Sequence, residues 1–350
     1  MKKLFQFIFK LLLFIVLIII TTFTYLTLTD YKPKSIENVY TSNEKQVVTK
    51  IKFEILTWNI GYAGLGSDMD FFYDGGEKVR TTKKRTQQNI DAISQKLSEY
   101  SNVDFILLQE VDIKAKRSYY INNIDNIKNK LPEFKYFYAP NYKVKYVPIP
   151  ITEPMGEVES GLVSFSKYEP YSVVRHSFDG NFSWPKKLFM LDRCFMVSRF
   201  KLKNNKDLLI INTHNSAFDD GTLKAKQLKQ ISDFVTAEYD KGNYIVLGGD
   251  WNQNPPNFND NIEENNEDAK ATFKISSISK EFLPNWHMFY DVNIPSNRFL
   301  TQAYVKGKTK ETILDMFLCS PNIDKVDIKT LDLEFKNSDH NPVLLKFELL

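Results

Sequence analysis

The sequence predicts a four-layered α/β sandwich, in which two packed mixed β-sheets are flanked by helices, and one N-terminal transmembrane helix precedes it. Three observations predict this fold class. Apolar runs of strand length alternate in part with segments of helical periodicity, strand-rich stretches lie between them, and an unbroken apolar run stands near the N-terminus. The 350 residues are enough for one large α/β domain with an appendage.

Residues 1–30 are predicted to form a unit of their own. Lys2, Lys3 and Lys10 precede an apolar run from Leu11 to Leu28, which is just long enough to cross a bilayer core as a helix. The lysines favour a cytoplasmic N-terminus, and therefore place the domain that follows the helix outside the cytoplasm. No Ala-x-Ala-like site closes the run, which favours an uncleaved anchor over a signal peptide. If the segment is cleaved, the protein is secreted.

The remaining elements follow along the chain. Residues 31–50 are polar, lack apolar periodicity and are interpreted as a linker, so the catalytic domain is expected over 51–350. Apolar spacing predicts helices over 82–100 and around 228–235. Two segments, 64–77 and the Asn/Asp/Glu-rich 257–270, are expected to be surface loops near the rim of the site. Strands are predicted over 53–58, 103–108, 208–213, 244–247, 313–318 and 343–347.

Carboxylate, carboxamide and imidazole side chains lie at the ends of several predicted strands. Open α/β sheets usually build their active sites where strands end. An oxygen-rich set of this kind suits a hard cation, Mg²⁺ with Mn²⁺ as an alternative, and histidine is the side chain suited to act as a base. Metal-assisted hydrolysis of a phosphate ester is the natural reaction. The segments are Trp58-Asn59, Gln109-Glu110, Thr213-His214, Gly249-Asp250-Trp251-Asn252, Leu314-Asp315-Met316 and Ser338-Asp339-His340.

In these segments, and in their order, the sequence resembles the endonuclease/exonuclease/phosphatase superfamily. This superfamily contains DNase I-like nucleases, inositol polyphosphate phosphatases and neutral sphingomyelinases. The resemblance covers roughly residues 51–350. It implies a DNase I-like fold and a metal-dependent phosphoesterase. Each motif by itself is weak, but six in the correct order are hard to explain by chance.

Three residues are candidates for the metal site. Glu110 is the best ligand, because an unpaired carboxylate at the end of an apolar strand would be costly and a cation removes that cost. Asn59 is expected to coordinate beside it or to orient its carboxylate. Asp339 is the second candidate for contact with the metal.

The other site residues are assigned to the reaction itself. His340 is the expected general base, with a pKa near 7, and the resemblance implies Asp315 as its partner. Asp250 is assigned to orienting or activating the nucleophile, and Asn252 to donating to a phosphate oxygen. His214 is expected to stabilise the pentacovalent state or to assist the leaving group. How Asp250 and His340 divide their roles stays open.

Several residues are left outside this set. For Arg193 the favoured expectation is a salt bridge with a neighbouring carboxylate, although it could reach a phosphate. His176 and His287 are expected to be surface or core residues. Cys194 and Cys319 have apolar neighbours in predicted strands and are expected to be buried free thiols.

The substrate is the least determined feature. The segment from Glu159 to Lys167 is similar to one that neutral sphingomyelinases carry between the Glu and His motifs. Phe182 and Trp184 could form an apolar tip, although packing against the domain is the commoner role. With the anchor, these features favour a lipid headgroup or a small phosphoester.

Two alternatives remain, an extracytoplasmic DNase I-like nuclease and a non-catalytic membrane-tethered binding protein. The net charge of +3 provides no general basic field for nucleic acid, so nucleic acid is not the favoured partner. The protein is expected to be a monomer.

Overall fold

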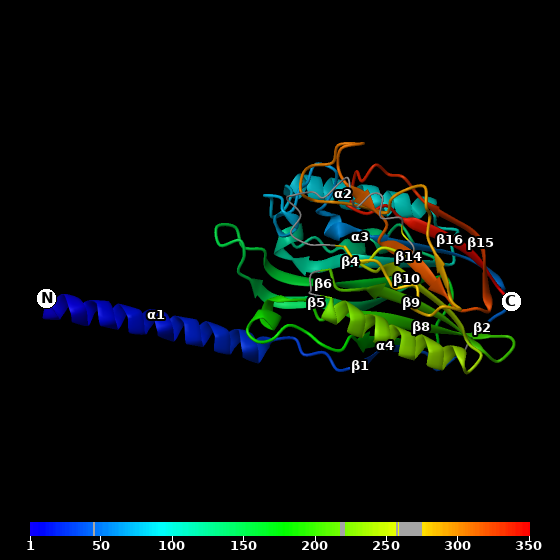
Figure 1. The fold of residues 1–350 in the computed structure, drawn as a ribbon, viewed down its shortest axis with the longest axis horizontal. Coiled ribbons are helices and arrows are strands. Elements are labelled where there is room, and N and C mark those ends of the chain that lie inside the picture. Colours follow the sequence, from blue (N-terminus) through cyan, green and yellow to red (C-terminus); the bar gives the residue numbers. More distant parts are fainter. Residues whose placement is uncertain (45, 218–220, 257, 259–274) are drawn as a thin grey trace.

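The computed structural model describes residues 1–44, 46–217, 221–256, 258 and 275–350. In this part of the chain, two mixed sheets pack face to face and helices cover their outer faces (Figure 1). The predicted four-layered α/β sandwich is confirmed. The acidic segment 257–270 lies outside the described residues except for Phe258, so its expected loop stays a prediction.

The first sheet has the order β1-β7-β8-β9-β10-β14-β11, and β2 pairs with β8. The register places β9 and β10 parallel, whereas β14 runs antiparallel to β10. Its strands are β1 (Ile36–Thr41), β2 (Val47–Val48), β7 (Ser172–Ser177), β8 (Cys194–Leu202), β9 (Asp207–His214), β10 (Tyr244–Asp250), β11 (His287–Phe289) and β14 (Asp315–Cys319).

The second sheet has the order β15-β16-β3-β4-β6-β5. Here β3 and β4 are the parallel pair. Its strands are β3 (Lys52–Asn59), β4 (Phe105–Ala115), β5 (Lys135–Val147), β6 (Gly156–Ser166), β15 (Ile323–Thr330) and β16 (Val343–Leu349). A short antiparallel ribbon is formed by β12 (Asn297–Arg298) and β13 (Glu311–Thr312). Both strands lie between β11 and β14 in the sequence.

Apolar side chains from both sheets form the central core, and each outer face has a core of its own. Phe53 and Phe105 of one sheet meet Phe200 and Phe317 of the other in the middle layer. The outer face of the second sheet is covered by α2 (Lys83–Glu99) and α3 (Asn123–Lys128), and that of the first by α4 (Thr222–Tyr239). Four 3₁₀ turns complete the described elements: η1 (Gly61–Ala63), η2 (Phe72–Asp74), η3 (Lys116–Ser118) and η4 (Lys186–Phe189).

The predicted helix over 82–100 is α2, which begins where its sequence signals a start. The Oγ1 atom of Thr82 accepts a hydrogen bond from the backbone N–H of Arg85, which satisfies one of the free donors of the first turn. Ile90, Ile93 and Leu97 lie on one face and are fully buried against the second sheet.

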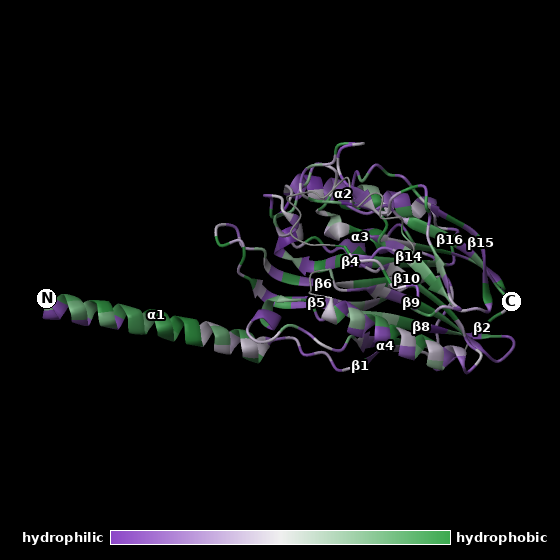
Figure 2. Cartoon of the chain, in the orientation of Figure 1, coloured by the Kyte–Doolittle hydropathy of each residue, from purple (hydrophilic) through white to green (hydrophobic). Residues whose placement is uncertain are grey.

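The N-terminal helix α1 (Lys2–Thr29) projects away from the sandwich (Figure 1), and it is long and apolar enough to cross a membrane. Figure 2 shows the apolar character continuing along most of its length. A signal sequence passes the same test of length and composition.

The segment 31–50 differs from the linker that the sequence predicts. Residues 36–41 form β1, an edge strand paired with β7, and Val47 and Val48 pair with β8. Val48 is buried in the central core, and Val39 and Tyr40 pack against a smaller cluster. Strand pairing supplies the hydrogen bonds that this polar segment needs, which apolar periodicity cannot reveal. The folded body therefore begins near Ile36.

Both cysteines are buried and free, as predicted. His176 stacks on Phe195 and His287 on Phe289, so neither contributes to the site described below.

Candidate active site

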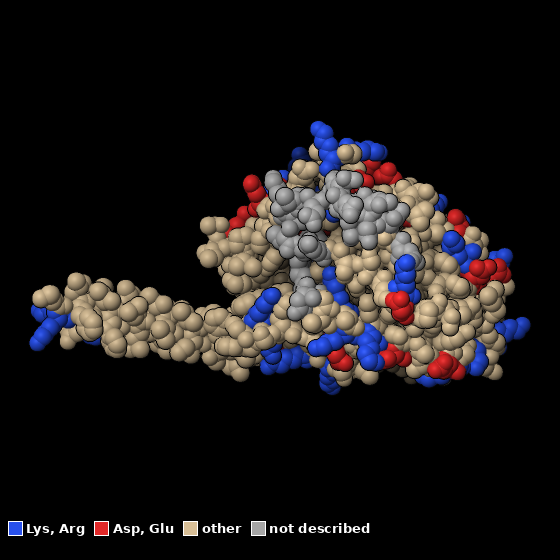
Figure 3. All heavy atoms as spheres, viewed as in Figure 1, with Lys and Arg blue, Asp and Glu red and all other residues tan. Residues whose placement is uncertain are grey.

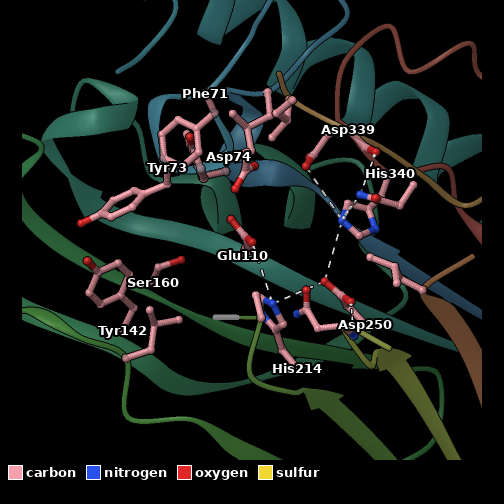
Figure 4. Close-up of a pocket in the computed structure, with 18 of the residues that line it drawn as sticks. Phe71, Tyr73, Asp74, Glu110, Tyr142, Ser160, His214, Asp250, Asp339 and His340 are labelled. Atoms are coloured by element: carbon pink, nitrogen blue, oxygen red, sulfur yellow. Dashed lines mark hydrogen bonds and ion pairs between the residues drawn. The ribbon is translucent and has the colours of Figure 1, made fainter. Parts of the chain in front are cut away.

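Strand register brings the predicted site residues to one edge of the sandwich. Asp250 ends β10 directly opposite His214 of the parallel β9 and opposite Asp315 of the antiparallel β14. On the second sheet, Asn59 ends β3 opposite Gln109 of β4. Because both parallel pairs present their carboxyl ends at the same edge, motifs far apart in sequence share one pocket. That pocket is lined by Glu110, His214, Asp250, Asn252, Asp339 and His340 among others (Figure 4).

The sequence predicts that Glu110 lies at the end of a strand. In the structure it lies inside β4, which continues to Ala115. The pairing of β4 with β6 is interrupted by a bulge between Leu108 and Val111, and Glu110 has a φ of +53° there. A non-glycine residue in this region costs about 1–3 kcal/mol, and such strain is concentrated at functional sites. The bulge turns the Glu110 carboxylate into the pocket instead of leaving it in the alternation of the strand.

Gln109 and Asn212 join the two sheets directly behind the site. Gln109 Nε2 donates to Asn212 Oδ1 at 2.7 Å and to Thr57 Oγ1 at 3.1 Å. Asn212 Nδ2 in turn donates to the carbonyls of Leu108 and Val163, both at 3.1 Å. Each amide is fully buried, and Gln109 directly precedes Glu110 whereas Asn212 lies two residues before His214, so this contact sets the spacing between Glu110 and His214.

Asp250 is the centre of the polar contacts. Its Oδ2 accepts a hydrogen bond from Asn59 Nδ2 at 2.9 Å and lies 3.4 Å from His214 Nε2 and 3.7 Å from His340 Nε2. Its Oδ1 accepts from the backbone N–H of Asn252 at 2.9 Å. Burial, with Asp315 close by, raises the pKa of Asp250. A carboxylate flanked by two imidazoles can hold and polarise a water molecule between them.

Asn59 connects this centre to Glu110. Its Nδ2 also lies 3.3 Å from Glu110 Oε1, while its Oδ1 accepts from the backbone N–H of Gly61 at 3.0 Å. The backbone donor requires the oxygen on that side, so the amide nitrogen faces the two carboxylates. Gly61 is needed here, because it has a φ of +49° and a Cβ on it would lie 2.7 Å from Asp339 Oδ1.

His340 is paired with Asp315 as the resemblance implies, with Nδ1 2.7 Å from Oδ2. On its other side, Nε2 lies 3.0 Å from Asn297 Nδ2. Burial by itself lowers the pKa of His340, but Asp315, Asp250 and Asp339 raise it to about 10. This exceeds the expected value near 7 because the sequence does not reveal three carboxylates around one ring.

His214 has the opposite electrostatic setting. Burial, reinforced by the nearby Arg193 and His340, holds its pKa well below the ordinary value, so the ring is neutral. Its Nε2 faces Asp250 Oδ2 at 3.4 Å and Glu110 Oε1 at 3.9 Å, whereas Nδ1 is buried without a hydrogen-bond partner among the described residues. The Nε2–H tautomer suits these contacts, which makes His214 a neutral donor directed at oxygen atoms.

Asn252 has a φ of +51° and lines the pocket. Its Nδ2 donates to the carbonyl oxygen of Asn215 at 2.9 Å. The side-chain amide is therefore held at the pocket edge, beside Asp250.

Asp74 is a site residue that the sequence did not indicate. It ends η2 in the predicted loop 64–77, where the signal was only a mixture of Gly, Asp and aromatic residues. Burial and the nearby Asp339 and Glu110 raise the pKa of its carboxyl group to about 8. For Asp339, burial and Glu110 raise the pKa to about 6, although His340 and Arg298 act in the opposite direction. Glu110, Asp339 and Asp74 thus converge with an excess of negative charge.

The oxygen donors of these groups fit a hard divalent cation, which would relieve their mutual repulsion. Within the described ranges, no three His, Cys, Asp or Glu groups are close enough to enclose an ion by themselves. The donor set therefore suits an open site in which water and substrate complete the coordination, as Mg²⁺ prefers.

The opposite wall of the pocket is largely apolar, and Arg193 is one of the arginines that line the pocket. Phe71, Tyr73 and Tyr142 line this wall in Figure 4, and Met155, Met190 and Leu191 complete it. Arg193 lines the same pocket, and its Nη1 donates to the carbonyl of His214 at 3.4 Å. The structure records no ion pair for Arg193 among the residues it describes, so the expected salt bridge stays a prediction. Burial lowers its pKa, yet guanidinium stays charged.

Comparison with known proteins identifies the fold and the chemistry. Residues 56–340 match the model of the Endonuclease/Exonuclease/phosphatase family. The chain belongs to this family. Its members are metal-dependent enzymes that hydrolyse phosphate esters, and this chain is such a hydrolase. The alternative of a non-catalytic binding protein is set aside.

The solved structures that resemble this chain share its fold at low identity. An endonuclease/exonuclease/phosphatase from Beutenbergia cavernae DSM 12333 is 16% identical with a TM-score of 0.56, over 86% of this chain and 72% of that one. TDP2 of D. rerio, complexed with a single-strand DNA product, is 11% identical with a TM-score of 0.53, over 85% and 99%. ANGEL2, a 2′,3′-cyclic phosphatase in complex with adenosine-2′,3′-vanadate, is 15% identical with a TM-score of 0.53, over 91% and 99%. The search of curated proteins gives no match.

Proposed function

We propose that this chain is a membrane-anchored, Mg²⁺-dependent phosphoesterase with its catalytic domain outside the cytoplasm. Its substrate is a phosphodiester or phosphomonoester, with a lipid headgroup or a small phosphoester favoured. The observation that carries the proposal is the set of contacts at Asp250, where Asn59, His214 and His340 meet beside Glu110 and Asp339.

Glu110 and Asp339 would hold the cation, and Asp74 lines the same pocket. The cation supplies Lewis-acid stabilisation of a phosphoryl oxygen. Asn59 orients the carboxylates of Glu110 and Asp250, since its amide nitrogen faces both. The bulge at Glu110 keeps this carboxylate directed into the pocket before any ligand binds.

Asp250 positions the attacking water. The His340–Asp315 pair would accept its proton as a neutral imidazole once a cation at Glu110 and Asp339 offsets part of the carboxylate charge that raises the pKa of His340. The hydrogen bond from Nδ1 to Asp315 orients the ring, so Nε2 faces Asp250 and the pocket. Neutral His214 donates from Nε2 to the phosphoryl oxygen or the leaving group, and Asn252 contacts a phosphate oxygen from the pocket edge. These donors are placed before the reaction, which is the arrangement that stabilises developing negative charge.

Arg193 and the apolar wall support an organic phosphoester as substrate. The Arg193 guanidinium, which has no ion pair among the described residues, is suited to bind a phosphate oxygen. Phe71, Tyr142 and Leu191 suit the apolar part of the substrate. An extracytoplasmic nuclease is the second candidate, because a relative of the same fold was solved with a single-strand DNA product.

The test measures product release by the full-length protein in phospholipid nanodiscs, with Mg²⁺ or EDTA. The panel contains plasmid DNA, phospholipid and sphingomyelin presented in vesicles, and soluble phosphate esters. The full chain is used because β1 and β2 precede residue 51. His340→Ala and Glu110→Gln are the site variants, and Lys329→Ala on the exposed edge strand β15 is the control.

We expect Mg²⁺-dependent cleavage of a lipid or small ester that both site variants lose and the control keeps. Cleavage of DNA alone would replace the lead proposal by the nuclease. Full activity of Glu110→Gln would refute the assigned metal site.

A further inference from the structure

We propose that the catalytic body docks onto the outer bilayer surface through a platform at the base of α1, which places the apolar pocket wall next to the lipid. The platform consists of Tyr146, Ile149, Ile151, Trp184, Lys186 and Lys187. This inference rests on the proposed role of α1 as an uncleaved anchor, and it specifies how the anchored enzyme meets its substrate.

The last turns of α1 pack against the body and do not extend freely. Phe23 contacts the rings of Trp184 and Phe189, with centroids 5.8 Å and 6.4 Å apart. Trp184 Nε1 donates to Thr27 Oγ1 at 3.2 Å, and Leu26 is buried. The helix therefore holds the body in a defined orientation to the membrane.

The length of the apolar run sets the depth of these contacts. Leu11 to Leu28 is about 18 residues, or about 27 Å at 1.5 Å per residue, so nearly the whole run is needed to cross a hydrocarbon core of about 30 Å. Phe23 and Thr27 then lie within the outer edge of that core. Trp184, which contacts both and is 57% exposed, lies at headgroup level, where tryptophan is enriched in membrane proteins.

The hairpin between β5 and β6 projects on the same side as α1 (Figure 1). Its stem adjoins the end of the helix, because Thr29 and Tyr31 share a cavity with Lys143 and Glu157, and Lys143 lies over the Tyr31 ring. At its tip, Ile149 is 40% and Ile151 is 90% exposed. Such isoleucines facing water near a membrane helix indicate insertion into the lipid surface.

Charge on the platform also favours a bilayer with anionic lipid. Lys186 and Lys187 lie in η4, which follows Trp184 and Pro185. Lys186 Nζ lies 3.8 Å from the centroid of the Phe182 ring. Burial raises the pKa of Asp30 and Asp192, and the charge of Lys187 acts against this effect. Lys and Arg side chains gather near the base of α1 in Figure 3, whereas the middle of the helix carries none. Each basic side chain at an anionic surface strengthens binding.

The platform is continuous with the pocket. The segment that packs on Phe23 through Phe189 continues into Met190, Leu191 and Arg193, which line the active site. Tyr142, on the same wall, donates its hydroxyl to the carbonyl of Phe189 at 3.0 Å. Met155, at the base of the hairpin, lines the pocket as well. A lipid at the surface thus has a short path along apolar side chains to the carboxylates and Arg193.

The test measures depth directly in the full-length protein. Ile151→Cys is labelled with an environment-sensitive fluorophore in nanodiscs of phosphatidylcholine and phosphatidylglycerol, with and without lipids that carry a quencher in their acyl chains. Val326→Cys, 55% exposed on β15 at the opposite end of the body, is the matched control. Native Cys194 and Cys319 are buried and unreactive, because burial raises the pKa of both thiols.

We expect the label at position 151 to shift to shorter wavelength and to be quenched by the modified lipids, and the label at position 326 to show neither effect. Equal responses at the two positions would overturn the docking surface. This readout needs no turnover, so it stays informative even if no lipid is hydrolysed and the proposed substrate class fails.

A second readout uses Ile151→Asp, which changes an exposed side chain outside the site. We expect kcat/KM for a lipid ester in vesicles to fall at least about tenfold, from the loss of one inserted apolar side chain, while a soluble ester is hydrolysed as before. Unchanged hydrolysis of the vesicle substrate, with Val326→Asp as control, would contradict the proposal.

Discussion

Replacing Asn212 by leucine tests whether the buried amide contact between the sheets supports the active site. The change removes the acceptor of Gln109 Nε2 and the donor to the Leu108 and Val163 carbonyls. Leucine has the same number of side-chain heavy atoms and the same branching, so no cavity is created. The loss of stability therefore comes mainly from the polar groups left unpaired.

The magnitude follows from these three groups. Gln109 Nε2 keeps its hydrogen bond to Thr57 but loses the shorter one, at a cost of about 1–2 kcal/mol for a buried donor. The two carbonyls lie in paired strands and lose only a second donor, about 0.5–1 kcal/mol each. We expect Asn212→Leu to lower the free energy of unfolding by about 2–4 kcal/mol.

Urea unfolding of the detergent-solubilised full-length protein, followed by tryptophan fluorescence, measures this loss. The control is Asn129→Leu at the exposed C-terminal end of α3, expected to change stability by less than about 0.5 kcal/mol. Hydrolysis should fall with Asn212→Leu even below the unfolding transition, because Glu110 and His214 are adjacent to the lost contact. A stability loss under about 1 kcal/mol with normal activity would refute the reasoning.

Three further outcomes are expected. Asp339→Asn should raise the Mg²⁺ concentration for half-maximal activity at least about tenfold, because it removes a charged ligand; an unchanged Mg²⁺ titration would exclude direct contact. Arg193→Gln should lower kcat/KM by about 10- to 100-fold, mainly through KM if the guanidinium binds the phosphate in the ground state, whereas an unchanged value would make Arg193 structural. Burial raises the pKa of Glu238, but hydrogen bonds from Arg199 and Lys241 outweigh it and lower the pKa to about 2. Glu238 therefore stabilises the fold above the unfolded pKa near 4.5 and loses this contribution as the pH falls towards 2. Glu238→Gln should flatten acid unfolding in that window, and an unaltered acid transition would contradict the ion pair.

The motif residues were accessible from sequence because their signals are local. An apolar run followed by Asn59, by His214 or by Asp250 indicates a strand whose polar end reaches an active-site edge, and parallel strands bring such ends together. The helix pattern of Ile90, Ile93 and Leu97 is equally local, and the apolar run of α1 depends only on composition. The roles assigned to these residues remain predictions that the variants above test.

Contacts between distant segments needed the tertiary structure. Asp74 and Arg193 have no sequence pattern, and they enter the pocket only because η2 and the segment before β8 fold over the strand ends. The pKa of His340 depends on carboxylates from three separate elements, and the strand β1 depends on a partner more than a hundred residues away. The sequence by itself determined the fold class and the chemical types at the site, since these follow from local pattern. The charge balance, the strain at Glu110 and the apolar wall of the pocket arise from spatial proximity that only folding creates.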